Sequence, residues 1–193
     1  MKTEVIAVSN RGTEIEEALK LTEAFAQKKG LDGKKALHLR LLTEEMMGMM
    51  RSITGETEGE FWIEDDTETA ELHLRVKTLL DTQTRDQLIS VSTSGKNEAT
   101  RTLMGKLRSF FEIGSAFPAP FRLVDNAEMN AVFTAWSLAE YRNQLREYRA
   151  ANGAGAEEEW DELEKSVVSH VADEVKVRVE NQVAEMIIYK WML

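Results

Sequence analysis

The stretch that decides the fold lies at residues 37–51 and reads LHLRLLTEEMMGMMR. Apolar side chains recur in it about every three and a half positions, and this spacing predicts a helix with one buried face. The members of the apolar stripe are Leu39, Leu42, Met46, Met49 and Ile53. We expect the helix to run from near Gly33 to Gly55, with Glu45 and Met49 one turn apart on neighbouring surface. A carboxylate and a thioether then lie side by side, and a thioether is a poor ligand for a hard cation.

Length, composition and charge limit the class of protein. The 193 residues, 42% of them hydrophobic, can bury one sizeable core, so we expect a single domain over residues 1–193. The formal net charge of -10 opposes binding to nucleic acid and to anionic membrane surfaces. The absence of cysteine excludes disulfides, thiolate metal sites and cysteine nucleophiles. No apolar run approaches the roughly 20 residues of a membrane-spanning helix and no secretory signal is visible, so we expect a cytoplasmic protein.

Strand patterns flank the central helix on both sides. The runs that read as strands are residues 3–8, 61–64, 72–78, 175–180 and 183–191. Between the first of these and the central helix, residues 14–29 predict an amphipathic helix that Gly30 ends. In the tail, Val175, Val177 and Val179 alternate with charged residues, and only Asn181-Gln182 separates the two final runs. The chain is therefore expected to end in a hairpin.

The middle of the chain reads mainly as helix. Helical patterns cover residues 97–112, 129–150 and 157–173, and residues 87–93 fit either a strand or the start of the first of these helices. Both prolines, Pro118 and Pro120, fall in residues 113–126, which we expect to form an extended loop. A helical insertion is therefore expected at about residues 113–156. Together the elements predict an α/β fold, a two-layer sandwich with a mixed, mainly antiparallel sheet and helices on one face.

Three parts of the sequence carry a family resemblance. They are the helix at residues 39–50 with its acidic pair, the strand at residues 72–79 that runs into Asp81, and the hairpin from Val175. In this order they resemble the histidine-kinase-like ATPase domain, also called the GHKL or Bergerat fold, and within it the bacterial anti-sigma-factor serine kinases. The resemblance spans most of the chain and rests on the order of the elements more than on signature residues. It places the insertion in the position of the family's nucleotide lid.

The resemblance implies a nucleotide site with ATP and Mg²⁺ as cofactors. The family's helix carries Glu-x-x-x-Asn, in which the glutamate activates the nucleophile and the asparagine ligates Mg²⁺; here Glu45 takes the first role and Met49 occupies the second position. The family's Asp-x-Gly-x-Gly signature, whose aspartate binds the adenine amino group, matches Asp81 but finds neither glycine in residues 81–85. Because phosphoryl transfer depends strongly on the metal ion, the missing amide argues against efficient catalysis.

Two further groups of residues bear on ligand binding. Ser94, Gly95 and Lys96 precede an expected helix and would cradle an anion through backbone amides and a lysine, although a capped turn is the reading we favour. The three histidines, His38, His73 and His170, have no metal-ligand spacing, so no metal site is predicted.

Three functional hypotheses follow. The preferred one is a regulatory protein with a degenerate ATPase-like domain that binds a protein partner, as anti-sigma kinases bind sigma factors and their antagonists, without efficient phosphoryl transfer. The alternative is an active serine/threonine protein kinase of the anti-sigma type, with Glu45 as base and Asp81 holding adenine. A further alternative is a ligand-free structural homodimer, paired through an apolar edge on the terminal strand that ends at Trp191.

Overall fold

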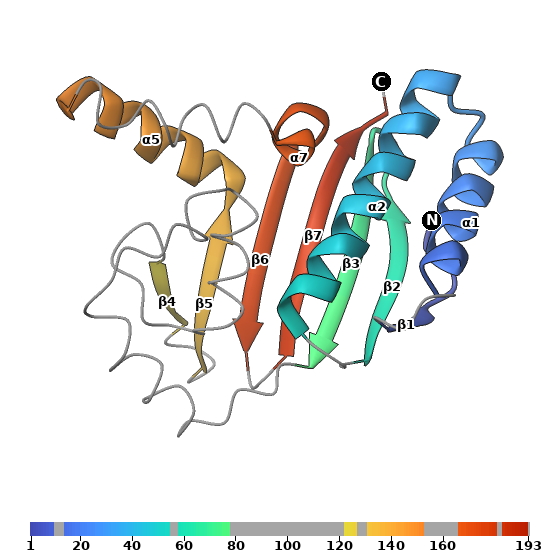
Figure 1. Ribbon diagram of the computed structural model, residues 1–193, viewed down its shortest axis with the longest axis horizontal. Helices are drawn as coiled ribbons and strands as arrows, with labels where there is room; N and C mark the ends of the chain where they lie inside the picture. Colours follow the sequence, from blue (N-terminus) through green and yellow to red (C-terminus); the bar gives the residue numbers. More distant parts are fainter. Residues whose placement is uncertain are drawn as a thin grey trace.

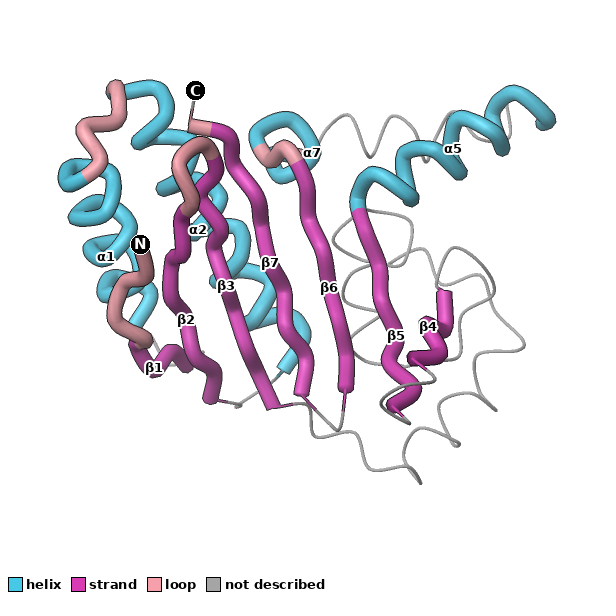
Figure 2. The backbone as a smooth tube through the Cα atoms, turned by 180° about the vertical axis from the view of Figure 1, so that it is seen from behind, coloured by secondary structure: helices cyan, strands magenta, loops and turns pink. Residues whose placement is uncertain are grey.

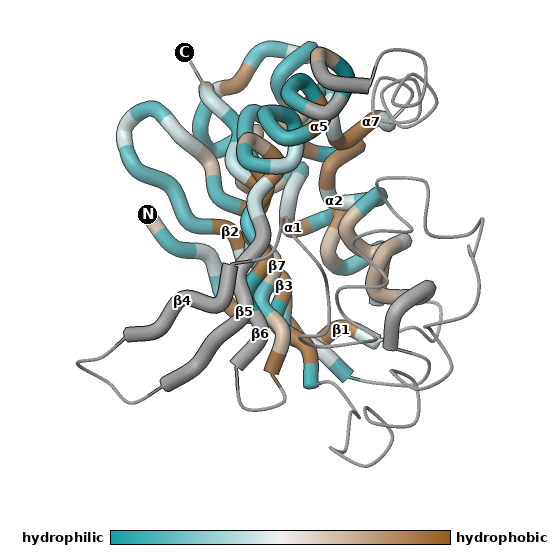
Figure 3. The backbone as a smooth tube through the Cα atoms, turned by 90° about the vertical axis from the view of Figure 1, so that its left-hand side faces the viewer, coloured by the Kyte–Doolittle hydropathy of each residue, from teal (hydrophilic) through white to brown (hydrophobic). Residues whose placement is uncertain are grey.

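The computed structural model describes residues 1–9, 14–54, 58–77, 122–126, 131–152, 166–180 and 183–192. These residues form two layers, a sheet and a set of helices packed on one of its faces (Figure 1). In the side view of Figure 3, α2 (Gly33–Thr54) lies to one side of the strands. The predicted two-layer α/β sandwich is confirmed.

The sheet has seven strands in the order β1-β2-β3-β7-β6-β5-β4. Their bounds are β1 Ile6–Ser9, β2 Glu58–Asp65, β3 Thr69–Lys77, β4 Arg122–Asn126, β5 Ala131–Ser137, β6 Glu174–Glu180 and β7 Val183–Trp191. Every pair of neighbouring strands is antiparallel. The last strand in the sequence, β7, therefore occupies the middle of the sheet.

Helices α1 (Glu14–Lys28) and α2 cover one face of the sheet, and the view from behind in Figure 2 shows strands in front of them. Gly30 ends α1 at a φ of 63°, a conformation that favours glycine. The Gly30 and Leu31 amides donate to carbonyls of the last turn of α1, at 3.0 and 3.1 Å. Asp32 then caps α2, because its carboxylate accepts the Lys35 amide at 2.8 Å, and this hydrogen bond lowers the pKa of Asp32.

The core lies between the helices and the inner face of the sheet. From the sheet it contains Phe61 and Ile63 of β2, Leu72 and Leu74 of β3, and Met186 and Ile188 of β7. Each such side chain contributes about 1.5–3 kcal/mol by leaving water. Two further helices are described in the second half of the chain. Helix α5 (Leu138–Asn152) continues from β5 and extends away from the sheet, and the short helix α7 (Val167–Val171) contacts α2 (Figures 1 and 2).

Two predictions in the middle of the chain are wrong. The expected helix at residues 129–150 begins only at Leu138, since Ala131–Ser137 forms β5, and the expected loop at residues 113–126 ends in strand β4. Residues 131–137 read AVFTAWS, rich in aromatic and β-branched residues, and their pairing with β6 outweighs the helical spacing. In its described residues, the segment at about 113–156 that we expected as a helical insertion contains β4 and β5 as well as α5.

Other expectations have mixed outcomes. The strands and helices predicted from residue 3 to residue 78 and the terminal hairpin are confirmed within a few residues. The helix expected at residues 157–173 is described only as α7, and residues 87–112 lie outside the described ranges. The terminal strand is not an edge, because β7 is paired with β3 on one side and β6 on the other. None of the helices in the described part of the chain is long and apolar enough to cross a membrane.

Candidate functional site

The structure describes one part of the predicted nucleotide site, the α2 segment with Glu45 and Met49. Glu45 is half-buried, whereas Met49 is 1% exposed and belongs to the core. The other predicted site residues, Asp81, Ser94, Gly95 and Lys96, lie outside the described residues. A common hollow bordered by Glu45 and Asp81 therefore stays a prediction.

The methionines of α2 are core residues. Met46, Met47, Met49 and Met50 are each 1% exposed or less, and they pack in one cluster with Leu39 and Leu42. Methionines on a helix can also line a pliable groove for a partner, and the burial of these four favours the core interpretation. A thioether in this position offers Mg²⁺ no ligand of the kind that it prefers.

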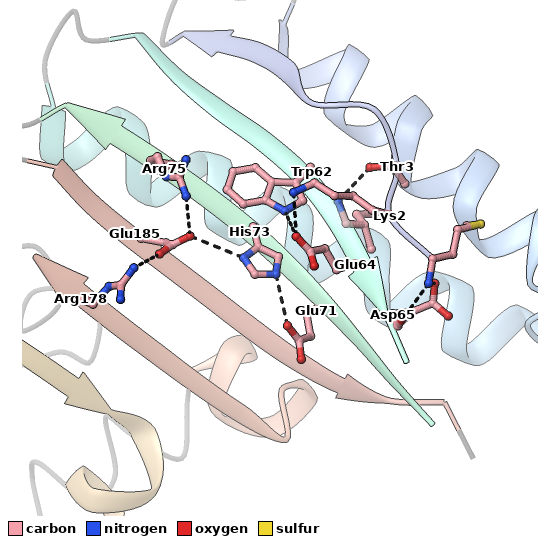
Figure 4. A network of polar contacts seen from close by, with 12 residues as sticks. Lys2, Thr3, Trp62, Glu64, Asp65, Glu71, His73, Arg75, Arg178 and Glu185 are labelled. Atoms are coloured by element: carbon pink, nitrogen blue, oxygen red, sulfur yellow. Dashed lines mark hydrogen bonds and ion pairs between the residues drawn. The ribbon is translucent and has the colours of Figure 1, made fainter. Parts of the chain in front are cut away.

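A second group of interacting residues covers the face of the sheet opposite α1 and α2, which we call the outer face. Register places Glu60, Arg75, Glu185 and Arg178 side by side on four neighbouring strands, with charges that alternate in sign. Arg75 forms an ion pair with Glu60 at 3.8 Å. Glu185 forms ion pairs with Arg75 at 3.3 Å and with Arg178 at 2.9 Å (Figure 4). We call these four residues the charge ladder. Its two positive and two negative side chains neutralise one another within one row of the sheet.

Next to the charge ladder, two aromatic rings stack between β2 and β3. The Trp62 and His73 ring centroids are 4.7 Å apart, with an interplanar angle of 9°. Lys2 Nζ and the Arg75 guanidinium lie 4.8 and 5.1 Å from the Trp62 centroid, and Trp62 is only 3% exposed. The stack is therefore a small apolar cluster that basic side chains cover from the solvent side.

Glu64 completes the contacts of Trp62. The indole Nε1 donates to Glu64 Oε1 at 2.7 Å, and Lys2 Nζ donates to the same oxygen at 2.9 Å. The hydrogen bond from Lys2, followed by that from Trp62, lowers the pKa of Glu64. These contacts connect the first residues of the chain to β2.

His73 lies between two carboxylates. Its Nε2 is 3.3 Å from Glu71 and its Nδ1 is 3.8 Å from Glu185, while neither ring nitrogen has a hydrogen-bond partner among the residues that the structure describes (Figure 4). His73 is 7% exposed, so it is a buried histidine. Within the described ranges, no three acidic or histidine side chains come together in a way that could hold a metal ion.

The sequence signalled only part of the outer face. Alternation over residues 71–77 is typical of a strand with one wet face, and the consecutive apolar residues Phe61, Trp62 and Ile63 are a signal, not used in the prediction, for cover on both faces of β2. The stacking of Trp62 on His73 depends on strand register, which no local spacing reveals. In comparisons with known proteins, no family model matches this chain, and neither does any curated protein.

Proposed function

We propose that this protein is a regulatory protein that binds a protein partner on a histidine-kinase-like ATPase framework and carries out no efficient phosphoryl transfer. The observation that carries the proposal is the burial of Met49, which is 1% exposed at the position where the family resemblance expects a magnesium-binding amide. Without that amide, Mg²⁺ would be held by phosphates and water alone, and its charge stabilisation in phosphoryl transfer would be weakened. Glu45 keeps a half-buried carboxylate one turn away.

Two further features support a binding role over a catalytic one. The two-layer arrangement, with helices on one face of an antiparallel sheet, agrees with the framework that the resemblance implies. The outer face, in contrast, carries dense polar and aromatic contacts that a catalytic role for α2 does not require. By the resemblance, we propose a partner of the sigma-factor or sigma-antagonist class, and a cytoplasmic location in keeping with a chain that lacks cysteine.

Thermal unfolding with nucleotide tests the proposal. A ligand at 100 times its Kd stabilises the folded state by about 2.7 kcal/mol, which for a chain of this size raises Tm by roughly 5–10 °C. We expect no Mg²⁺-dependent rise in Tm with ATP and no ATP hydrolysis above the rate without protein. Matched samples with ATP and EDTA separate metal-dependent binding from binding of the nucleotide alone.

The alternative, an active serine/threonine kinase-like ATPase, predicts the opposite. A Mg²⁺-dependent rise in Tm that disappears in Asp81→Ala, together with hydrolysis that falls in Glu45→Gln, would refute the proposed loss of catalysis. Both variants need the same Tm as the wild type without nucleotide for this comparison to hold.

A further inference from the structure

Three apolar side chains run along the outer face of β7, the middle strand of the sheet. Ala184, Met186 and Ile188 point into the core, so Ile187, Tyr189 and Trp191 alternate onto the outer face. Ile187 and Tyr189 are half-buried, and Trp191 is 64% exposed, more than any other large hydrophobic side chain of the described residues. We call Ile187, Tyr189 and Trp191 the β7 strip. Exposed tryptophan and tyrosine are enriched where proteins bind partners.

Carboxylates flank the β7 strip on both sides. In the sheet register, Tyr189 lies opposite Glu71 of β3 and Glu174 of β6. Burial raises the pKa of Tyr189, and the negative charges of Glu71, Glu174 and Glu185 raise it further. These three carboxylates are therefore close enough to Tyr189 to affect its ionisation. Among the described residues, one cation lies over this ring: Lys176 Nζ is 5.0 Å from the centroid of Tyr189.

Glu71 has little compensation for its charge. Within the described part of the chain its ion-pair partner is His73, whose Nε2 lies 3.3 Å away, whereas Glu185 is held by two arginines. The next carboxylate in the same cross-strand row, Glu64 of β2, is paired with Lys2 at 2.9 Å and adds no uncompensated charge. Glu71 therefore leaves a negative charge beside the β7 strip, which favours basic residues on whatever covers the strip.

The dimensions of the β7 strip suit one helix. From residue 187 to residue 191 the strand advances roughly 13 Å, which about nine residues of an α-helix span. No described helix covers this face, whereas α1 and α2 cover the other (Figure 2). A helix on a sheet face is the usual way to bury such a surface. A second copy of this chain is a poor occupant, since it would bring its own acidic flanks and a net charge of -10.

We propose that the outer face docks a basic amphipathic helix of a protein partner, with the apolar side of that helix on Ile187, Tyr189 and Trp191 and its basic residues beside Glu71 and Glu174. This docking site rests on the proposed function for the existence of a protein partner, and it is independent of what α2 does with nucleotide. The contact resembles an interface with an aromatic centre and a charged rim.

Binding of a defined peptide tests the docking site. The probe is a fluorescently labelled synthetic helix of about 14 residues, with leucines on one face and lysines on both flanks. One control peptide has glutamate for every lysine, and another has the same composition with the leucines scattered around the helix. Fluorescence anisotropy gives the Kd with wild type, Trp191→Ser, Glu71→Gln and the matched control Glu17→Gln, an exposed position on α1.

We expect only the basic amphipathic peptide to bind. Trp191→Ser should weaken binding at least about tenfold, because it removes the most exposed aromatic side chain of the β7 strip. Glu71→Gln should weaken it severalfold and reduce its salt dependence. Glu17→Gln should leave Kd within about twofold, since its charge lies far from the contact. Each variant should keep the Tm of the wild type, because Trp191 and Glu71 are partly or largely exposed.

Several results would overturn the docking site. One is that the scattered or the acidic peptide binds as tightly as the basic amphipathic peptide. Another is that Trp191→Ser leaves the Kd of the basic amphipathic peptide unchanged. A third is a dimer in light scattering that Trp191→Ser abolishes, which would assign the outer face to a second copy of the chain. The two proposals fail separately. Mg²⁺-ATP stabilisation with normal peptide binding refutes only the loss of catalysis, whereas absent stabilisation together with absent peptide binding refutes only the docking site.

Discussion

Asp65, at the end of β2, carries a buried carboxylate between two cations. Its side chain is 2% exposed; Oδ1 lies 3.1 Å from the N-terminal ammonium, and Oδ2 forms an ion pair with Lys29 Nζ. Burial raises the pKa of Asp65, but the contacts with Lys29 and with the N-terminal ammonium outweigh burial, so the pKa lies below its ordinary value. The ion pair fastens the end of β2 to the end of α1.

Asp65→Asn should lower the free energy of unfolding by about 2 kcal/mol at neutral pH, because Lys29 keeps its charge at 29% exposure and loses its partner. Since the folded-state pKa is depressed, the carboxylate stabilises the protein above its unfolded-state pKa of about 3.9. This contribution is lost as the pH falls through the folded-state value. Urea unfolding of both proteins should therefore show a constant difference at about pH 5–7 that shrinks below about pH 4.

Lys29→Gln supplies the control for this ion pair. In that background, Asp65→Asn should change the free energy of unfolding by less than it does in the wild type, because the shared interaction is already gone. Equal effects in the two backgrounds would show that Lys29 does not stabilise the carboxylate.

Alanine substitutions at Gly59 of β2 and Gly48 of α2 should change the free energy of unfolding in opposite directions. A Cβ on Gly59 of β2 would lie 2.8 Å from Val76 Cγ1 and 2.9 Å from the Arg75 carbonyl oxygen, so Gly59→Ala should destabilise the protein by about 1–3 kcal/mol. Gly48 of α2 has no atom within 4 Å of such a Cβ, and Gly48→Ala should stabilise by about 0.5–1 kcal/mol through helix propensity. Urea unfolding measures both, and a shift of both in one direction would contradict the packing of β2 on β3.

The sequence predicts a helix or strand well where the residues of that segment alone determine its structure. Helices α1 and α2 each have an apolar stripe at helical spacing, and Gly30 separates them. Strand β6 alternates apolar with charged residues, and only two residues connect it to β7. All four elements were therefore predictable. The segment at residues 131–137 was not, because its spacing also fits a helix and its strand pairing with β6 lies about 40 residues away in sequence.

The candidate site divides in the same way. The neighbourhood of Glu45 and Met49 follows from helical spacing alone, as does the burial of Met46 and Met49, whereas Met47 and Met50 are buried although they lie off the predicted stripe. The contact of His73 with Trp62 and Glu185 joins three strands, so it needs the order β2-β3-β7 as well as the register. Neither the strand order nor the register is encoded in any short stretch of sequence, so the sequence does not predict the contacts of the outer face.

The whole molecule depends on its last strand. β7 pairs along all nine of its residues with β3 and along seven of them with β6, so it joins the N-terminal strands β1, β2 and β3 to the strands β4, β5 and β6. The sheet is therefore complete only when the C-terminal hairpin is in place. Such non-local pairing slows folding, because distant parts of the chain must meet first.

Amide hydrogen exchange should reflect this arrangement. Amides of β3 and β7, paired on both sides along strands of nine residues, should exchange only by global unfolding. Amides of β1, an edge strand of four residues, should open locally and exchange at least about tenfold faster, which corresponds to about 1.4 kcal/mol. Gly59→Ala should then accelerate exchange in β3 and β7 together, since all of these amides share one global opening. Protection in β1 equal to that in β7 would contradict a sheet organised around its last strand.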